Sequence, residues 1–228
     1  PRDQLLSPLQ SVCGIVEKRH TLPILSNVLM EKDGEKLTLL ATDIEIQITT
    51  QTPTIGPEKA AMTVGARKLQ DILRSLPETA EVSLAFEDKR LQLKAGKSRF
   101  NLQTLPAEDF PRMGSADGQP SRLLITQKQM KRLLALVQYA MAQQDIRYYL
   151  NGLLLVAKGN ELRMVATDGH RLAYAAEVLP SAPTPIEVIL PRKTVLELSR
   201  QLADNDDPLE ITLTPTQARF SFGGIELV

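Results

Sequence analysis

The sequence predicts an α+β protein made of two tandem copies of one domain, each with mostly antiparallel strands and two helices that cover one face of the sheets. Three observations support this prediction. Short motifs recur at a spacing of about 125 residues, both halves follow the same order of helix-like and strand-like periodicity, and 228 residues are enough for two domains of ordinary size. A duplicated domain indicates a repeated surface, as in an arc, ring or array, rather than one active site.

The repeated motifs keep one order along the chain. LSNVL at residues 25–29 is echoed by YLNGL at 149–153, LATD at 40–43 by VATD at 165–168, and ARK at 66–68 by PRK at 191–193. Three matches in one order, at offsets of 124 or 125, are not expected by chance.

The first copy begins with an amphipathic helix, because Leu5, Leu9, Val12 and Val16 recur at helical spacing. Strands are expected at residues 28–30, 37–41, 44–50, 82–86, 90–94 and 99–103, with a second helix at 66–76. Residues 111–121 contain Gly, Pro and small polar residues, so we expect them to link the copies.

The second copy repeats this order. We expect helices at residues 127–142 and 192–202, and strands at 150–156, 162–166, 172–178, 211–213, 219–222 and from 226 onward.

Composition excludes several classes of protein. The single cysteine, Cys13, cannot form an intrachain disulfide, which favours a reducing, cytoplasmic compartment. One cysteine and two histidines exclude a zinc site of usual composition, and no glycine-rich phosphate loop is present, so we expect no metal and no cofactor. No apolar run approaches the roughly 18 residues that a membrane span needs, so no membrane association is expected.

The helices are basic although the chain is neutral overall. Residues 66–76 and 191–202 each carry a net charge of +2, and residues 127–142 carry +3. For one helix, a solvated charged face is the ordinary explanation. Several helices of the same sign indicate instead a surface for phosphate groups, and the low aromatic content, 4%, favours duplex over single-stranded nucleic acid.

Two short motifs attract a chemical interpretation. Asp168 and His170 could act in acid–base catalysis, but no nucleophile motif accompanies them, and a turn between strands is the simpler prediction for Asp168-Gly169. We therefore expect no catalytic residues. Tyr148-Tyr149 is expected either as a strand with one buried ring or as part of an apolar pocket for a partner.

Four stretches closely resemble the bacterial DNA polymerase III beta subunits, the sliding clamps. They are HTLPILSN at residues 20–27, the segment 98–111, QDIRYYLNG at 144–152 and ATDGHRLA at 166–173, and the resemblance extends over essentially the whole chain. It implies tandem DNA-clamp domains with antiparallel sheets outside and two helices on the inner face.

The resemblance also implies a domain organisation. Residues 1–113 would be clamp domain I with its first few residues missing, residues 121–228 would be clamp domain II truncated at its C-terminal end, and a third domain would be absent. In the family, two full-length subunits close head to tail into a homodimeric ring around duplex DNA. We expect the chain to be a non-catalytic subunit of the DNA polymerase III holoenzyme that cannot close this ring alone.

The sites implied by the resemblance fall into two groups. The residues implied for sequence-independent contact with double-stranded DNA are Arg19, Arg67, Arg74, Gln144, Arg192 and Lys193. The residues implied for a cleft that binds the polymerase III alpha subunit, the clamp loader and other proteins with clamp-binding motifs are Tyr148, Tyr149, Leu150, Thr167, Gly169, His170, Arg171 and Leu172. The third domain supplies the other wall of this cleft in the family, so half a pocket is expected here. The alternatives are a protein-interaction module that does not form a ring and an enzyme that uses Asp168 and His170.

Overall fold

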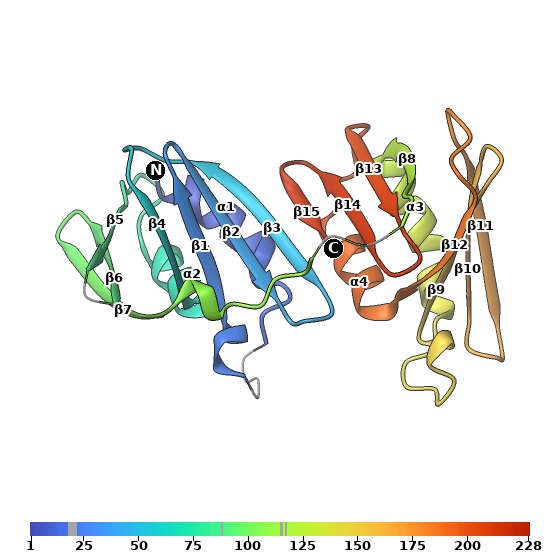
Figure 1. The fold of residues 1–228 in the computed structure, drawn as a ribbon, viewed down its shortest axis with the longest axis horizontal. Helices are drawn as coiled ribbons and strands as arrows, with labels where there is room; N and C mark the ends of the chain where they lie inside the picture. Colours follow the sequence, from blue (N-terminus) through green and yellow to red (C-terminus); the bar gives the residue numbers. More distant parts are fainter. Residues whose placement is uncertain (18–21, 88, 115, 117) are drawn as a thin grey trace. The chain divides into compact units, whose positions relative to one another are not determined.

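The computed structural model describes residues 1–17, 22–87, 89–114, 116 and 118–228. It divides into two compact units, Pro1–Met113 (unit 1) and Gly114–Val228 (unit 2), which are described separately (Figure 1). In both units, helices pack against antiparallel sheets, so the predicted α+β class is confirmed.

The elements of unit 1, with η for a 3-10 helix, are α1 (Arg2–Cys13), η1 (Pro23–Ser26), β1 (Asn27–Asp33), β2 (Lys36–Thr42), β3 (Gln47–Pro53), β4 (Lys59–Gly65), α2 (Ala66–Ser75), β5 (Ser83–Glu87), β6 (Arg90–Ala95), β7 (Ser98–Leu105) and η2 (Ala107–Asp109). The strands form one antiparallel array in the order β5-β6-β7-β4-β1-β2-β3. Helix α1 packs on β2, β3 and α2, and its buried side chains recur at helical spacing, as the sequence predicts.

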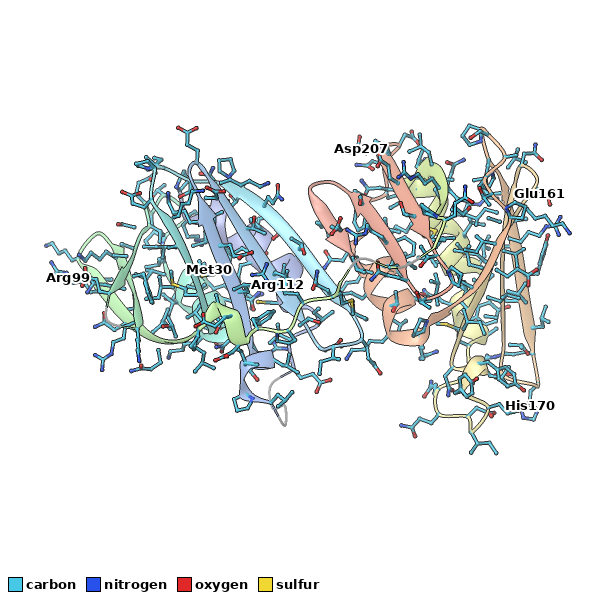
Figure 2. The ribbon with its side chains drawn as sticks, viewed as in Figure 1. Met30, Arg99, Arg112, Glu161, His170 and Asp207 are labelled. Carbon is cyan, nitrogen blue, oxygen red and sulfur yellow. The ribbon has the colours of Figure 1, made fainter. Side chains whose placement is uncertain are left out.

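The opposite face of this sheet is covered by the segment that follows β7. Phe110 packs on Leu29 of β1 and Leu40 of β2 in a separate small core. Arg112, which is labelled in Figure 2, then makes a bidentate ion pair with Glu31 of β1, at 2.7 and 3.1 Å. Both faces of these central strands are therefore buried, which explains why they are apolar at consecutive positions.

The elements of unit 2 are β8 (Ser121–Thr126), α3 (Gln127–Val137), η3 (Gln138–Ala140), η4 (Tyr148–Leu150), β9 (Gly152–Lys158), β10 (Glu161–Thr167), β11 (Leu172–Val178), β12 (Ile186–Pro191), α4 (Arg192–Gln201), β13 (Pro208–Leu213), β14 (Ala218–Phe222) and β15 (Ile225–Leu227). One sheet has the order β15-β14-β13-β8 and the other β11-β10-β9-β12. Helix α3 begins with a capping box, in which Thr126 and Gln129 bond to each other's main-chain N–H groups. Helix α4 packs on β9 and β12, and α3 packs on β10 and β11 (Figure 1).

The two units repeat single hydrogen bonds as well as elements. The main-chain N–H of Asp43 donates to Ile46 O in unit 1, and that of Asp168 donates to Arg171 O in unit 2. The Thr42 hydroxyl donates to the same Ile46 carbonyl, as the Thr167 hydroxyl does to Arg171. Each partner is displaced by 125 residues, so the sequence repeat is a repeat of three-dimensional structure.

Some predicted elements were wrong in extent. The strand expected at residues 44–50 begins only at Gln47, because Ile44 lies in a turn with a φ of 81° and its side chain is exposed. Helix α3 ends at Val137, earlier than expected, and continues as the short η3. Strands β4, β8 and β12 were not predicted: β4 is rich in alanine, and β8 falls partly in the expected linker.

Candidate functional site

Two of the predicted DNA-contact arginines, Arg67 and Arg192, lie in the first turns of α2 and α4. Arg67 is exposed, and its Nη2 donates to Val16 O at 2.6 Å. Arg192 is half-buried, and its Nη1 donates to Met141 O at 3.4 Å. Lys193 follows Arg192 and is also half-buried. The arginine contacts use one guanidinium N–H group each, which leaves further donors for an anion.

The remaining predicted contacts lie at separate places in the chain. Arg74 is exposed in the last turn of α2, and Gln144 is exposed between η3 and η4. Arg19 lies outside the described residues. The basic helix faces are weaker than the sequence indicates, because Glu197 binds Arg200 at 2.6 Å and Lys131 donates to Leu202 O at 2.9 Å.

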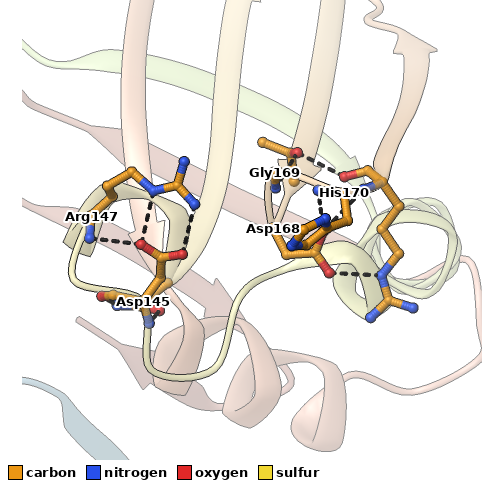
Figure 3. A network of polar contacts seen from close by, with 8 residues as sticks. Asp145, Arg147, Asp168, Gly169 and His170 are labelled. Atoms are coloured by element: carbon orange, nitrogen blue, oxygen red, sulfur yellow. Dashed lines mark hydrogen bonds and ion pairs between the residues drawn. The ribbon is translucent and has the colours of Figure 1, made fainter.

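The segment between η3 and η4 is held by a compact set of hydrogen bonds. Asp145 and Asn151 bond reciprocally, since Asn151 Oδ1 accepts from the Asp145 main-chain N–H and Asn151 Nδ2 donates to Asp145 O. The Asp145 carboxylate accepts three bonds from Arg147, from its main-chain N, Nε and Nη2, at 2.8 to 2.9 Å (Figure 3). This network fixes the segment that presents Gln144 and Ile146 to solvent.

The turn between β10 and β11 is a second hydrogen-bonded structure. Asp168 accepts from the main-chain N–H groups of His170 and Arg171, and from Arg171 Nε at 3.0 Å. Thr167 Oγ1 accepts from the Gly169 N–H at 3.1 Å. The predicted turn at Asp168-Gly169 is therefore observed, with a φ of 89° at Gly169, a conformation that favours glycine.

The two structures lie next to each other at one end of unit 2 (Figures 2 and 3). A Cβ atom added to Gly169 would lie only 3.1 Å from Arg147 Nη2. The fold thus brings the segment 145–150 next to the segment 167–172. These segments contain the residues that the resemblance implies for a cleft, which are residues 148–150, 167 and 169–172.

The side chains that these segments expose are largely apolar. Tyr148 is 82% exposed, Leu172 64% and Tyr149 50%, whereas Leu150 is buried. The two tyrosine rings pack edge to face with centroids 5.9 Å apart. The prediction of one buried ring was wrong, because these residues form η4 rather than a strand. Large exposed apolar side chains in one region are typical of a binding surface.

The carboxylates of this region are held in their ionised form. Hydrogen bonds from the Arg147 side chain lower the pKa of Asp145 to about 2. Main-chain hydrogen bonds from His170 and Arg171 lower the pKa of Asp168. A carboxylate that accepts several bonds and has a lowered pKa is a poor proton donor or acceptor near neutral pH, which does not favour the catalytic alternative.

Neither a metal site nor a membrane-spanning helix is found in the described part of the chain. Among the described residues, no group of three or more His, Cys, Asp or Glu side chains could hold a metal ion. Over the same part of the chain, every helix is too short or too polar to cross a bilayer.

Three side chains that hold the candidate site together were not predicted from the sequence. Asp145 and Arg147 brace the segment between η3 and η4, and Tyr139 lies 5.5 Å from the Arg171 guanidinium in a cation–π contact. The Asp-x-Arg spacing at residues 145–147 is a local signal that could have indicated the ion pair. Nothing local indicates the Tyr139 contact, because its partner is 32 residues away.

The chain matches two family models. Residues 1–114 match the N-terminal domain of the DNA polymerase III beta subunit, and residues 124–228 match its central domain. A beta sliding clamp of Pseudomonas aeruginosa is 45% identical over 225 residues, which are 97% of this chain and 61% of that protein. The chain thus spans about three fifths of the length of this curated relative.

Solved structures give the same result. The DNA polymerase III subunit beta of P. aeruginosa superposes with a TM-score of 0.94 at 44% identity, covering 99% of this chain and 62% of that one. A second structure, of a sliding clamp from the same species bound to griselimycin, has a TM-score of 0.93 at 44% identity, with the same coverage. Because the two family models together cover nearly the whole sequence, the chain belongs to the DNA polymerase III beta subunit family.

Proposed function

We propose that the chain is the N-terminal and central part of a DNA polymerase processivity factor, a beta sliding clamp. Clamp domain I corresponds to residues 1–113 and clamp domain II to residues 121–228, and a third domain completes the subunit. Two complete subunits close into a ring around duplex DNA in the cytoplasm. The observation that carries this proposal is the match to two consecutive domains of one family over nearly the whole chain.

The clamp works without catalysis. It tethers the polymerase III alpha subunit, and the clamp loader and other proteins with clamp-binding motifs use the same cleft. A ring holds its partner to DNA by topology, so its contacts to phosphate must be weak and independent of base sequence. The repeated arginines at the starts of α2 and α4 suit this role, because a guanidinium group is a permanent cation whose N–H groups bond to phosphate oxygens.

The partner cleft is assigned to the two segments that meet at Arg147 and Gly169. Tyr148, Tyr149 and Leu172 supply exposed apolar area, and the hydrogen-bonded turns beneath them are rigid. A rigid apolar surface loses little conformational entropy when a short peptide binds. The third domain supplies the opposite wall, so this chain alone has a low affinity for such peptides.

The test of the DNA surface is the salt dependence of binding to duplex DNA. Arg192→Ala with Lys193→Ala removes two cations at the start of α4. Each phosphate contact contributes roughly −0.9 to the slope of log K against log salt, so the slope becomes shallower by about 1 to 2. The matched control is Arg122→Ala with Lys158→Ala, which removes the same charge from exposed strand positions of unit 2. Equal effects of the two double variants would count against the assignment of the DNA surface to α4.

A further inference from the structure

The two DNA-contact arginines are bound to equivalent carbonyl groups in the two units. Arg67 donates to Val16 O and Arg192 to Met141 O, and both the donors and the acceptors are 125 residues apart. The acceptors lie in matching turns, because the Val16 N–H donates to Cys13 O and the Met141 N–H to Gln138 O. The same contact is thus made once in each repeat.

Each of these carbonyl groups stands at the start of a segment that carries a predicted DNA contact. Arg19 is three residues after Val16, and Gln144 is three residues after Met141. Val16 and Met141 are each only 2% exposed, so both acceptor residues are fixed in the core of their unit.

In unit 2, Arg192 contacts both ends of the segment. Its main-chain N–H donates to Asn151 O at 2.9 Å, and its guanidinium donates to Met141 O. The ends are also joined directly, because the Ala142 N–H donates to Leu150 O at 3.0 Å. Arg192 therefore closes the base of the loop at residues 142–150, while Asp145 and Asn151 close its middle.

We propose that Arg192 is a positioning residue: its side chain fixes the base of the loop at residues 142–150, which carries the predicted DNA contact Gln144. This inference rests on the proposed DNA-binding function, which assigns a role to that loop. It adds a second role for Arg192 beyond the charge that it presents to phosphate.

The chemistry of the guanidinium group allows both roles at once. Arginine has five N–H donors in a rigid, planar fork, and each of these contacts uses one of them. The carbonyl groups just past the end of a helix carry partial negative charge and favour a cation. The remaining N–H groups, at the start of α2 or α4, are then left to bind a phosphate.

The test uses this chain and four variants. Arg192→Met removes the guanidinium but keeps an aliphatic side chain, and Lys128→Met is its control, since Lys128 is exposed and the substitution removes the same charge from the start of α3. Gln144→Ala alone, and together with Arg192→Met, completes a double-mutant cycle. The readouts are amide hydrogen exchange at Ala142 and Leu150 and the affinity for a duplex oligonucleotide at low salt.

The expected result has two parts. Arg192→Met speeds exchange at Ala142 and Leu150 by about tenfold, which corresponds to about 1.4 kcal/mol, and Lys128→Met leaves it unchanged. Gln144→Ala weakens DNA binding about threefold in the parent chain but has almost no further effect beside Arg192→Met, because the loop is already displaced.

The contrary results separate the two claims. Unchanged exchange at Ala142 in Arg192→Met overturns the positioning role, whatever happens to DNA affinity. Faster exchange with additive losses of affinity overturns the link between the loop and DNA. If the parent chain and the complete protein show no salt-dependent DNA binding, the proposed function fails. The exchange data then test only whether Arg192 fixes the base of the loop at residues 142–150.

Discussion

Arg147 lies close to the position that a side chain would occupy at residue 169. Its Nη2 would lie 3.1 Å from a Cβ atom added to Gly169, and it is held there by Asp145 at 2.8 Å. Glycine therefore allows the turn to lie against the segment 145–150 without a shift of Arg147. The candidate cleft depends on this close approach between two segments that are about twenty residues apart in sequence.

The first prediction is that Gly169→Ala destabilises unit 2 by about 2 kcal/mol, through a disfavoured positive φ and a contact that displaces Arg147. Gly159→Ala is the matched control, because Gly159 also has a positive φ, of 61°, but has no atom within 4 Å of an added Cβ. Chemical denaturation measures both, and the control is expected to cost about 1 kcal/mol. Equal losses would show that Arg147 does not restrict this position.

The second prediction concerns Ile44, which occupies the position of Gly169 in unit 1. Its φ is 81°, an unfavourable value for a β-branched residue, and its side chain is 55% exposed. Ile44→Gly is expected to stabilise unit 1 by about 1 kcal/mol, since relief of strain outweighs the greater freedom of the unfolded chain.

Ile55→Gly controls for the loss of an exposed isoleucine, because Ile55 is 94% exposed and is not among the positive-φ residues. Thermal unfolding is expected to move to a higher temperature for Ile44→Gly only. A lower unfolding temperature for both variants would contradict the inferred strain at Ile44.

The third prediction is a pH dependence of the loop at residues 142–150. The pKa of Asp145 is about 2 in the folded chain, against an ordinary value of 3.8, because Arg147 stabilises the carboxylate. Asp145 therefore contributes stability that is complete above about pH 4 and is lost as the pH falls towards 2. Carboxylate NMR titration should give a midpoint near 2 for Asp145.

The amide exchange of Arg147, whose N–H donates to this carboxylate, should accelerate over the same interval relative to its expected pH dependence. Asp145→Asn is the control that should abolish this component. A midpoint near 4 would contradict the ion pair.

The fourth prediction tests the cleft in the complete protein. Leu172→Asp places a charge on the exposed apolar surface beside the β10–β11 turn, and it is expected to weaken binding of a clamp-binding peptide by at least about 2 kcal/mol. Val178→Asp is the control, because Val178 is 63% exposed on the same strand, β11, and on the same face. Calorimetric titration of the peptide should show a loss of affinity for Leu172→Asp and little change for Val178→Asp. Undiminished affinity in Leu172→Asp would remove the assignment.

Much of the fold could be predicted because the sequence is periodic and repeated. The stripes of Leu69, Ile72 and Leu73 in α2 and the alternation of β10 are local signals of burial on one face. Strand β4 has no comparable signal, because its buried residues, Met62, Thr63 and Val64, are consecutive rather than alternating. The strand expected from Ile44 fails because the turn bonds of Asp43 override the alternating pattern.

The sequence predicted the segments of the candidate site but not how they contact each other. The motifs around residues 145–150 and 167–172 were visible, but their contact through Arg147 and Gly169 is set by the pairing of strands β9, β10 and β11. The role predicted for Arg192 from the sequence was incomplete for the same reason. Its charge is evident in the sequence, whereas its bond to Met141 depends on how α4 packs in unit 2.

The measurement that tests the central claim most directly uses the complete encoded protein, loaded by its clamp loader onto a nicked circular plasmid. The plasmid is then cut once, and the protein that remains bound is measured. A sliding clamp is held by topology, so it should stay on the circle and be released from the linear DNA. Equal retention on both forms would show ordinary binding to DNA and would contradict the ring.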